Sequence, residues 1–79
     1  MRVLLFAHLK DATGAAELEL TISESLDADG FWRKLIAAQP ALAKFRRTTR
    51  LARNGQYADA KTRFSDSDEV ALIPPVSGG

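Results

Sequence analysis

The group best suited to chemistry in this sequence is the carboxylate at its C-terminal end, which follows Gly78 and belongs to Gly79. A carboxylate is a poor electrophile until it is converted to a mixed anhydride such as an acyl-adenylate. Glycine suits that use, because a residue without a Cβ can enter a narrow channel and lie close to a nucleotide. The alternative is that the two glycines are simply a frayed end. We predict that Gly79 is the reacting residue.

The residues before the diglycine favour an arm that leaves a folded body. Pro74 and Pro75 have no N–H to donate to a neighbouring strand, so sheet pairing must stop there. Fully extended, the four residues 76–79 reach roughly 13 Å. We therefore expect a folded domain over residues 1–75 and a flexible tail over residues 76–79.

Other side chains offer little for conventional catalysis. His8 is the single histidine, no motif places an acid beside it, and we interpret it as a strand-end residue in a polar contact. The chain has no cysteine, which excludes disulfides, thiolate metal sites and thiol nucleophiles. Asp66, Asp68 and Glu69 lack the spacing and the glycine of a calcium loop, so we interpret them as turn and strand-entry residues. We predict no metal site.

Length and composition limit the class of protein. With 79 residues, of which 46% are apolar and 27% charged, the sequence is typical of one small globular domain. A core of this size is marginal, so a partner would help it. No apolar run is long enough to cross a membrane and no signal-peptide pattern is present, so we expect a cytoplasmic protein without membrane contact.

The charge is unevenly distributed, although the net charge is only +1. Residues 40–64 carry seven of the eleven basic side chains and a single acid, Asp59, so this segment has a net charge of +6. Such a surface could meet phosphates or an acidic partner, or it could be a solvated helix end and loop. No aromatic side chains alternate with these charges, which argues against nucleic-acid binding.

The polarity pattern predicts five strands and one main helix. Trp32 falls on the apolar stripe of that helix and is interpreted as a packing residue rather than a ligand-stacking one. Asn54 and Gly55 form the strongest hairpin signal, and Phe64 is expected to be buried in an irregular polar stretch. In chain order we expect strands over 2–8 and 17–22, a helix over 28–38, a helical turn over 40–45, and strands over 49–54, 56–58 and 70–73. Asp27 or Asp29 is expected to be the N-cap of the helix.

A helix between two hairpins, followed by a strand apolar enough to be central, implies an α+β sheet covered on one face. If the last strand lies beside the first and parallel to it, the fold is a β-grasp, the ubiquitin-like architecture with about five strands in a mixed sheet. Alternation then sends Val3, Leu5, Val70 and Leu72 into the core. The same alternation leaves Leu4, Phe6 and Ile73 on an open face, where an apolar patch beside the tail is by hypothesis a docking surface.

On these residues the chain resembles the small subunit of molybdopterin synthase, a ubiquitin-like sulfur-carrier protein. The resemblance covers essentially the whole chain. It is carried by residues 3–7, 9–11 and 14, by 51–55, and most specifically by 68–79. The Pro-Pro-Val-x-Gly-Gly ending separates this family from the thiamine sulfur carriers, which usually lack the proline pair.

The resemblance implies a carrier cycle rather than catalysis by this chain. An E1-like adenylyltransferase would adenylate the carboxylate of Gly79 with ATP, and a sulfur donor protein would convert the adenylate to a thiocarboxylate. The loaded tail would enter the large subunit of molybdopterin synthase and pass its sulfur to cyclic pyranopterin monophosphate. Two such transfers build the dithiolene of molybdopterin. Catalytic side chains would belong to the large subunit, and no cofactor would be bound permanently.

The resemblance also implies which residues meet the large subunit. Phe6, Tyr57 and Ile73 match the docking surface of the family. The tail residues Pro74, Pro75, Val76 and Ser77 would accompany Gly78 and Gly79 into the partner. Two alternatives stay open: a sulfur carrier for thiamine synthesis or tRNA thiolation, and a β-grasp binding module whose tail is never activated.

Overall fold

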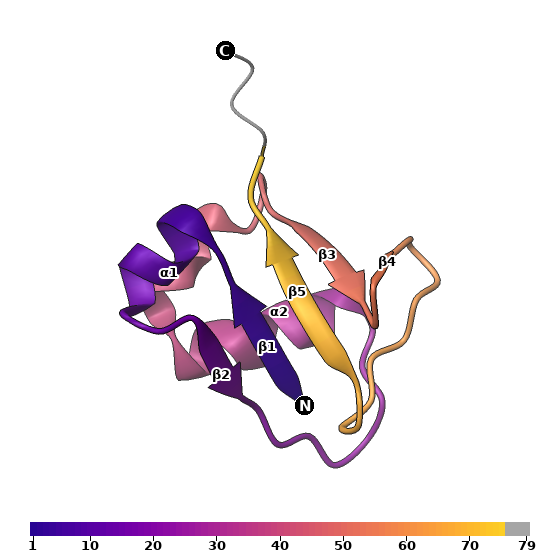
Figure 1. Ribbon diagram of the computed structural model, residues 1–79. Coiled ribbons are helices and arrows are strands. Elements are labelled where there is room, and N and C mark those ends of the chain that lie inside the picture. The colour runs from indigo at the N-terminus through magenta and orange to yellow at the C-terminus, as the bar shows by residue number, and fades with distance from the viewer. Residues whose placement is uncertain (76–79) are drawn as a thin grey trace.

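The last strand, β5 (Glu69–Ile73), is the centre of a five-stranded sheet with the order β2-β1-β5-β3-β4 (Figure 1). The computed structural model describes residues 1–75. β5 pairs in parallel with β1 (Arg2–Leu5) and antiparallel with β3 (Arg50–Arg53). β2 (Glu17–Glu19) and β4 (Gln56–Tyr57) are the edge strands. The β-grasp fold predicted from the sequence is confirmed.

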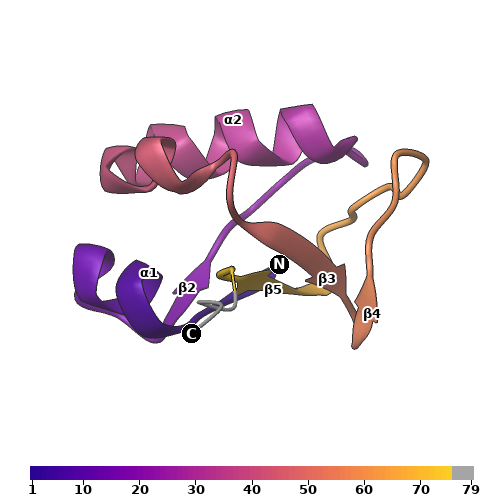
Figure 2. The ribbon, with the colours of Figure 1, turned by 90° about the horizontal axis from the view of Figure 1, so that it is seen from above.

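One main helix, α2 (Ala28–Ala38), lies across one face of the sheet (Figure 2). It begins as predicted at Asp27, whose side chain accepts a hydrogen bond from the Gly30 N–H at 2.8 Å and so satisfies one of the free donors of the first turn. A 3-10 helix, η1 (Pro40–Phe45), follows it directly. Trp32 is buried and packs edge-to-face on Phe31, which confirms its role in packing.

The two central strands send alternate side chains into the core under α2. Each of the four side chains predicted to point inward is at most 1% exposed: Val3, Leu5, Val70 and Leu72. The β1–β5 register pairs Val3 with Val70 and Leu5 with Leu72, so the four side chains lie next to one another. Burying each of them contributes on the order of 1.5–3 kcal/mol.

The segment after β1 differs from the prediction. The expected strand over residues 2–8 ends at Leu5. For residues 9–14 the sequence indicated a hairpin connection or a single helical turn, and the structure has a longer helix there, α1 (Ala7–Thr13). His8 therefore lies exposed on a helix, not at a strand end. Ala7 turns the chain at a φ of 49°, and Phe6 supplies no side-chain cap, so the usual signals of a helix start are missing. None of the helices within residues 1–75 is long and apolar enough to span a membrane.

The second strand is also shorter than the predicted range 17–22, although Leu20 and Ile22 are buried as alternation requires. The reason is the length of β1. Its pairing with β2 ends at Arg2 and Glu19, and Leu20 donates one further hydrogen bond to the Met1 carbonyl at 2.8 Å. Beyond that point no strand partner is available to Ile22, whose N–H instead donates to the Asp66 carboxylate at 3.0 Å.

The irregular stretch before β5 is tied to the rest of the fold through Phe64, as predicted. This side chain is fully buried and stacks on Phe31 with a distance of 5.2 Å between ring centroids. Its backbone exchanges two hydrogen bonds with Leu26, at 2.8 and 2.9 Å. The segment can therefore remain irregular and still hold a fixed position beside the N-terminal end of α2.

The acidic residues of this stretch close the turn into β5, which confirms their interpretation as turn and strand-entry residues. Asp68 accepts hydrogen bonds from the Ser65 N–H at 2.8 Å and from the Asn54 side chain at 3.0 Å. Asp66 accepts from the Ile22 N–H, and this bond, assisted by the amino group of Met1, lowers the pKa of the Asp66 carboxyl.

We expect Asp66→Asn to lower the stability at neutral pH and to weaken its dependence on acid. The pKa of Asp66 is lower in the folded state than in the unfolded chain. The carboxylate thus stabilises the fold above the unfolded value, near 3.8, and this contribution is lost as pH falls through the folded value. Urea midpoints at pH 7 and pH 3 measure the effect, with Asp11→Asn on exposed α1 as the control. If the wild type, Asp66→Asn and Asp11→Asn all lost the same amount of stability between pH 7 and pH 3, the prediction would be wrong.

Candidate functional site

The face of the sheet opposite α2 carries the candidate docking surface. No helix of the described chain covers this face over β5 and β3 (Figure 2). The strand register aligns one uncharged row across four strands, in which Leu4 lies beside Ala71, Ala71 beside Ala52, and Ala52 beside Tyr57. We call this side of the sheet the open face. Besides that row it includes the residues at the levels on either side of it: Arg2 and Glu69 at one end, and Arg50 and Ile73 at the other.

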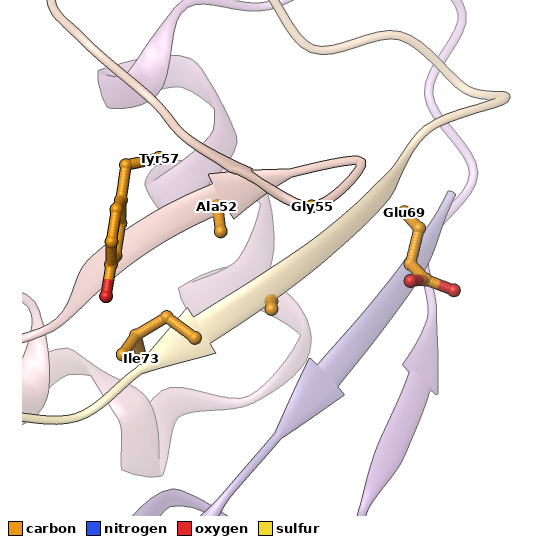
Figure 3. Close-up of a pocket in the computed structure, with 6 residues that line it drawn as sticks. Ala52, Gly55, Tyr57, Glu69 and Ile73 are labelled. Atoms are coloured by element: carbon orange, nitrogen blue, oxygen red, sulfur yellow. The ribbon is translucent and has the colours of Figure 1, made fainter.

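A hollow of about 310 Å³ lies in the open face. Its wall at the exit of β5 is formed by Tyr57 and Ile73, whose side chains lie near each other in Figure 3, and Glu69 lies at the opposite end. Between them the small side chains of Ala52 and Ala71 leave the sheet surface low. The hollow is thus wide enough for an apolar side chain of a partner, and it exists because two paired strands present alanine at the same level.

The structure places the three predicted docking residues on this face. Tyr57 is 59% exposed and Phe6 is 45% exposed, and they are the large exposed apolar side chains of the described residues. Ile73 is half-buried at the end of β5. Since Leu5 is paired with Leu72, continuing this register puts Phe6 beside Ile73. Two exposed aromatic rings around an isoleucine are a typical composition of a protein-binding surface.

The tail begins at the same end of the open face, where β5 ends at Ile73. Pro74 is half-buried and Pro75 is exposed, immediately after the last residue of β5. The other predicted tail residues, Val76, Ser77, Gly78 and Gly79, lie outside the described residues. A partner that covers Ile73 thereby comes next to the root of the tail.

The sequence reasoning missed one residue of the open face, Arg50. Its guanidinium lies over the ring of Tyr57, 4.1 Å from the ring centroid, and its backbone is paired with Ile73. A cation above an aromatic face is attracted by the ring quadrupole. The sequence contained the information needed to place Arg50 near Tyr57. The two-residue Asn54-Gly55 turn determines which residues of β3 and β4 are neighbours.

At the other end of the open face the charge is mainly acidic. Arg2 lies between carboxylates, with Glu17 hydrogen-bonded on one side and Glu69 at 3.2 Å on the other. The hydrogen bond to Glu17, supported by the charge of Glu69, raises the pKa of the Arg2 guanidinium. Glu19 is paired with Arg2 in the register and adds a third carboxylate.

Much of the basic segment serves the fold. Arg46 is paired with Asp29 of α2, and this bond, more than the contact with Arg33, lowers the pKa of the Asp29 carboxyl. Arg53 donates to the Arg63 carbonyl, and Arg63 donates to the carbonyl of Ser25. These contacts favour the structural interpretation for part of the segment.

Comparisons with known proteins agree with this geometry. The model of the ThiS family matches residues 3–79. A molybdopterin synthase sulfur carrier subunit of Chlamydomonas reinhardtii is 35% identical, over 100% of this chain and 98% of its own. That of Arabidopsis thaliana is 33% identical, over 100% of this chain and 82% of its own. The crystal structure of SAMP1 from Haloferax volcanii is 29% identical and has a TM-score of 0.84, covering 100% and 98% of the two chains.

The fold and the open face together define a ubiquitin-like β-grasp protein whose last strand ends beside an exposed apolar surface. Within that class the chain belongs to the ThiS family. The resemblance to small subunits of molybdopterin synthase found in the sequence is thereby confirmed.

Proposed function

We propose that this chain is the sulfur-carrier subunit of a molybdopterin synthase and that Gly79 carries the sulfur. One observation carries the proposal more than any other. Relatives that bear this name are 33–35% identical to the chain, and the region of similarity spans its full length.

The chemistry of the carrier takes place at the terminal carboxyl group. A carboxylate oxygen of Gly79 attacks the α-phosphate of ATP in an E1-like enzyme, and pyrophosphate leaves. Hydrosulfide supplied by a donor protein then attacks the acyl carbon, AMP leaves, and loss of the sulfur-bound proton gives the thiocarboxylate. In the large subunit the thiocarboxylate sulfur bonds to a side-chain carbon of cyclic pyranopterin monophosphate while the carbon–oxygen bond at that carbon breaks. Water then hydrolyses the acyl–sulfur bond, which leaves the sulfur on the pterin and restores the carboxylate of Gly79.

The open face explains how a small domain can serve this cycle without catalytic side chains of its own. Apolar burial against Phe6, Tyr57 and Ile73 holds the domain on its partner, and the tail reaches from the edge of that contact into the active site. The open face thus provides the binding affinity and the tail provides the reacting group. One surface can therefore serve both the loading enzyme and the large subunit in turn.

We expect Phe6→Ala and Ile73→Ala each to weaken binding of the large subunit by about 1–3 kcal/mol, as for buried apolar residues in other interfaces. Isothermal calorimetry with the purified large subunit measures the change. Ile36→Ala is the matched control, because Ile36 is a half-buried isoleucine on α2, on the other side of the sheet. Unchanged affinity in both open-face variants would remove this surface from the proposal.

The direct test of the carrier chemistry is the intact mass of the protein isolated from cells that are making the molybdenum cofactor. We expect a species heavier by the exchange of one oxygen for one sulfur, located at Gly79 by fragmentation. An exclusively unmodified terminus, in samples handled to prevent thiocarboxylate hydrolysis, would argue instead for a binding module. ATP–pyrophosphate exchange with the activating enzyme separates the same two cases, since a carrier alone forms the adenylate.

The pathway is tested separately from the chemistry. The loaded carrier is offered to the large subunit of molybdopterin synthase, to a thiazole synthase and to a tRNA-thiolating enzyme. Sulfur transfer to the pterin alone supports the proposal, and transfer to either other acceptor in its place assigns the chain to that pathway.

The likeness to SAMP1, a small archaeal modifier protein, favours one second candidate function: covalent attachment of this chain to other proteins. An activated Gly79 would serve that purpose with an amine in place of sulfur as the nucleophile. Immunoblots of an N-terminally tagged chain test it, since conjugates appear at higher mass and require Gly79.

A further inference from the structure

Arg50 is the basic residue of segment 40–64 that the structure places on the open face. Its side chain is exposed, and no carboxylate of residues 1–75 lies within 4.0 Å of its guanidinium nitrogens. The contact with the Tyr57 ring holds it in place without neutralising its charge. With respect to residues 1–75, Arg50 is therefore a positioned cation whose guanidinium donors are available to a partner.

The position of Arg50 is set by the strand register. It is paired with Ile73, the last residue of β5, so it stands at the edge from which the tail leaves the domain. At the opposite end of the open face, the side chains of Arg2, Glu17, Glu19 and Glu69 sum to a net charge of −2. The N-terminal ammonium of Met1 also lies 3.3 Å from Glu19, and the carboxylate of Asp66, 3.4 Å from that ammonium, balances its charge.

These two charged edges act separately. The levels of Glu69 and Ile73 are four residue steps apart on β5, which corresponds to roughly 13 Å along the strand. That separation exceeds the screening length of about 8 Å at physiological ionic strength. A partner that approaches the open face thus meets a negative edge, an apolar middle and a positive edge in a fixed order.

We propose that this polarity orients the protein that receives the tail, and that Arg50 pairs with carboxylates beside the opening of the partner's active-site channel. The inference rests on the proposed function, because it requires a partner that takes up the tail. A guanidinium binds a carboxylate through two parallel N–H donors, so the pair would define orientation as well as add attraction. A partner docked the wrong way round would place carboxylates against Glu69 and is disfavoured.

The anion that fits Arg50 is a protein carboxylate rather than the phosphate of the nucleotide. The reacting carboxyl group lies six residues beyond Ile73 in the chain. In a channel that takes the tail extended, six residues span about 20 Å. One arginine side chain cannot cover that distance, whereas in the proposed complex the rim of the channel would lie beside Arg50, at the level of Ile73.

The first test compares charge reversal at two positions. Arg50→Glu and Lys34→Glu change the net charge equally, but Lys34 lies exposed on α2, on the far side of the sheet. Association rates with the large subunit are measured by stopped flow at low and at physiological salt. At low salt we expect Arg50→Glu to slow association about tenfold or more and Lys34→Glu less than about twofold, with the difference shrinking as salt is added.

Arg50→Met separates loss of attraction from added repulsion. It removes the charge and retains an unbranched apolar stem, so an intermediate slowing is expected. Circular dichroism of each variant verifies that the fold is retained before rates are compared.

The second test identifies the partner group. Arg50→Lys retains the positive charge and provides an amine, which a carbodiimide joins to any carboxylate in contact with it. Mass spectrometry of the cross-linked complex should connect position 50 to an Asp or Glu of the large subunit, while Lys34 gives no such product.

The outcomes are distinct. If the wild-type chain does not bind the large subunit, the proposed function fails and this inference fails with it. If the wild-type chain binds, but Arg50→Glu associates as fast as Lys34→Glu and position 50 forms no cross-link, the proposed function stands and the role of Arg50 is refuted. Slower association of Arg50→Glu together with the cross-link supports the inference.

Discussion

Removal of Gly79 is expected to abolish sulfur transfer and to leave the folded domain unchanged. In the proposed cycle the acyl carbon that accepts sulfur belongs to this residue, and a chain that ends at Gly78 is shorter by about 3.5 Å. A misplacement of 1 Å at a reacting centre can already cost a factor of about 100 in rate. The pterin product of the reconstituted reaction should therefore fall by at least two orders of magnitude.

The stability of the truncated chain should equal that of the full chain, because the buried apolar residues of the described range 1–75 end at Leu72. Thermal unfolding of both chains tests this half of the prediction. Lys61→Ala, in an exposed loop away from the open face, serves as the control for handling and should transfer sulfur normally. A chain without Gly79 that still yields molybdopterin would refute the proposed role of the tail.

Phe64→Ala should destabilise the protein by about 3–5 kcal/mol, the range observed for buried phenylalanine. The Phe64 ring is fully buried and stacked on Phe31 of α2, and its backbone is hydrogen-bonded to Leu26. A domain of this size has a total stability of roughly 5–15 kcal/mol. The variant should therefore be largely unfolded at a moderate urea concentration where the wild type is intact.

Phe6→Ala provides the matched control, since it removes the same side chain from an exposed position on the open face. Its free energy of unfolding should change by less than about 1 kcal/mol. The two phenylalanines are thus expected to separate stability from binding: Phe64 for the first and Phe6 for the second. Similar urea midpoints for both variants would show that Phe64 does not carry the packing assigned to it.

The sheet was predictable from the sequence because its signals are local and regular. The two-residue alternation in β1 and β5 assigned Val3 and Val70 to the core and Phe6 and Ile73 to the other face, and the structure agrees. The start of α2 was also encoded locally, by the capping side chain of Asp27.

The first helix could not be predicted in the same way. α1 is seven residues long, has no capping side chain, and begins at an alanine with a positive φ, which local preference disfavours. Its single buried residue, Leu9, gives no periodic pattern. Packing with the rest of the fold, rather than propensity, determines this element.

For the candidate site, residue types predicted the members but not their arrangement. Phe6, Tyr57 and Ile73 were identified from alternation and resemblance, whereas the hollow between them depends on Ala52 and Ala71 lying side by side. In a sequence, two alanines do not indicate a hollow. Only the pairing of β3 with β5 shows that they leave space at one level.

The position of β5 between β1 and β3 also orders events during synthesis of the chain. The ribosome releases β1 early and β5 last, so a growing chain lacks the strand that joins the two halves of its sheet. Until β5 enters, Ile73 is absent from the open face and the hollow has no floor. The open face is therefore completed only after β5, the last strand of the sheet, has been synthesised and paired. A growing chain without β5 thus cannot present the complete open face to a partner.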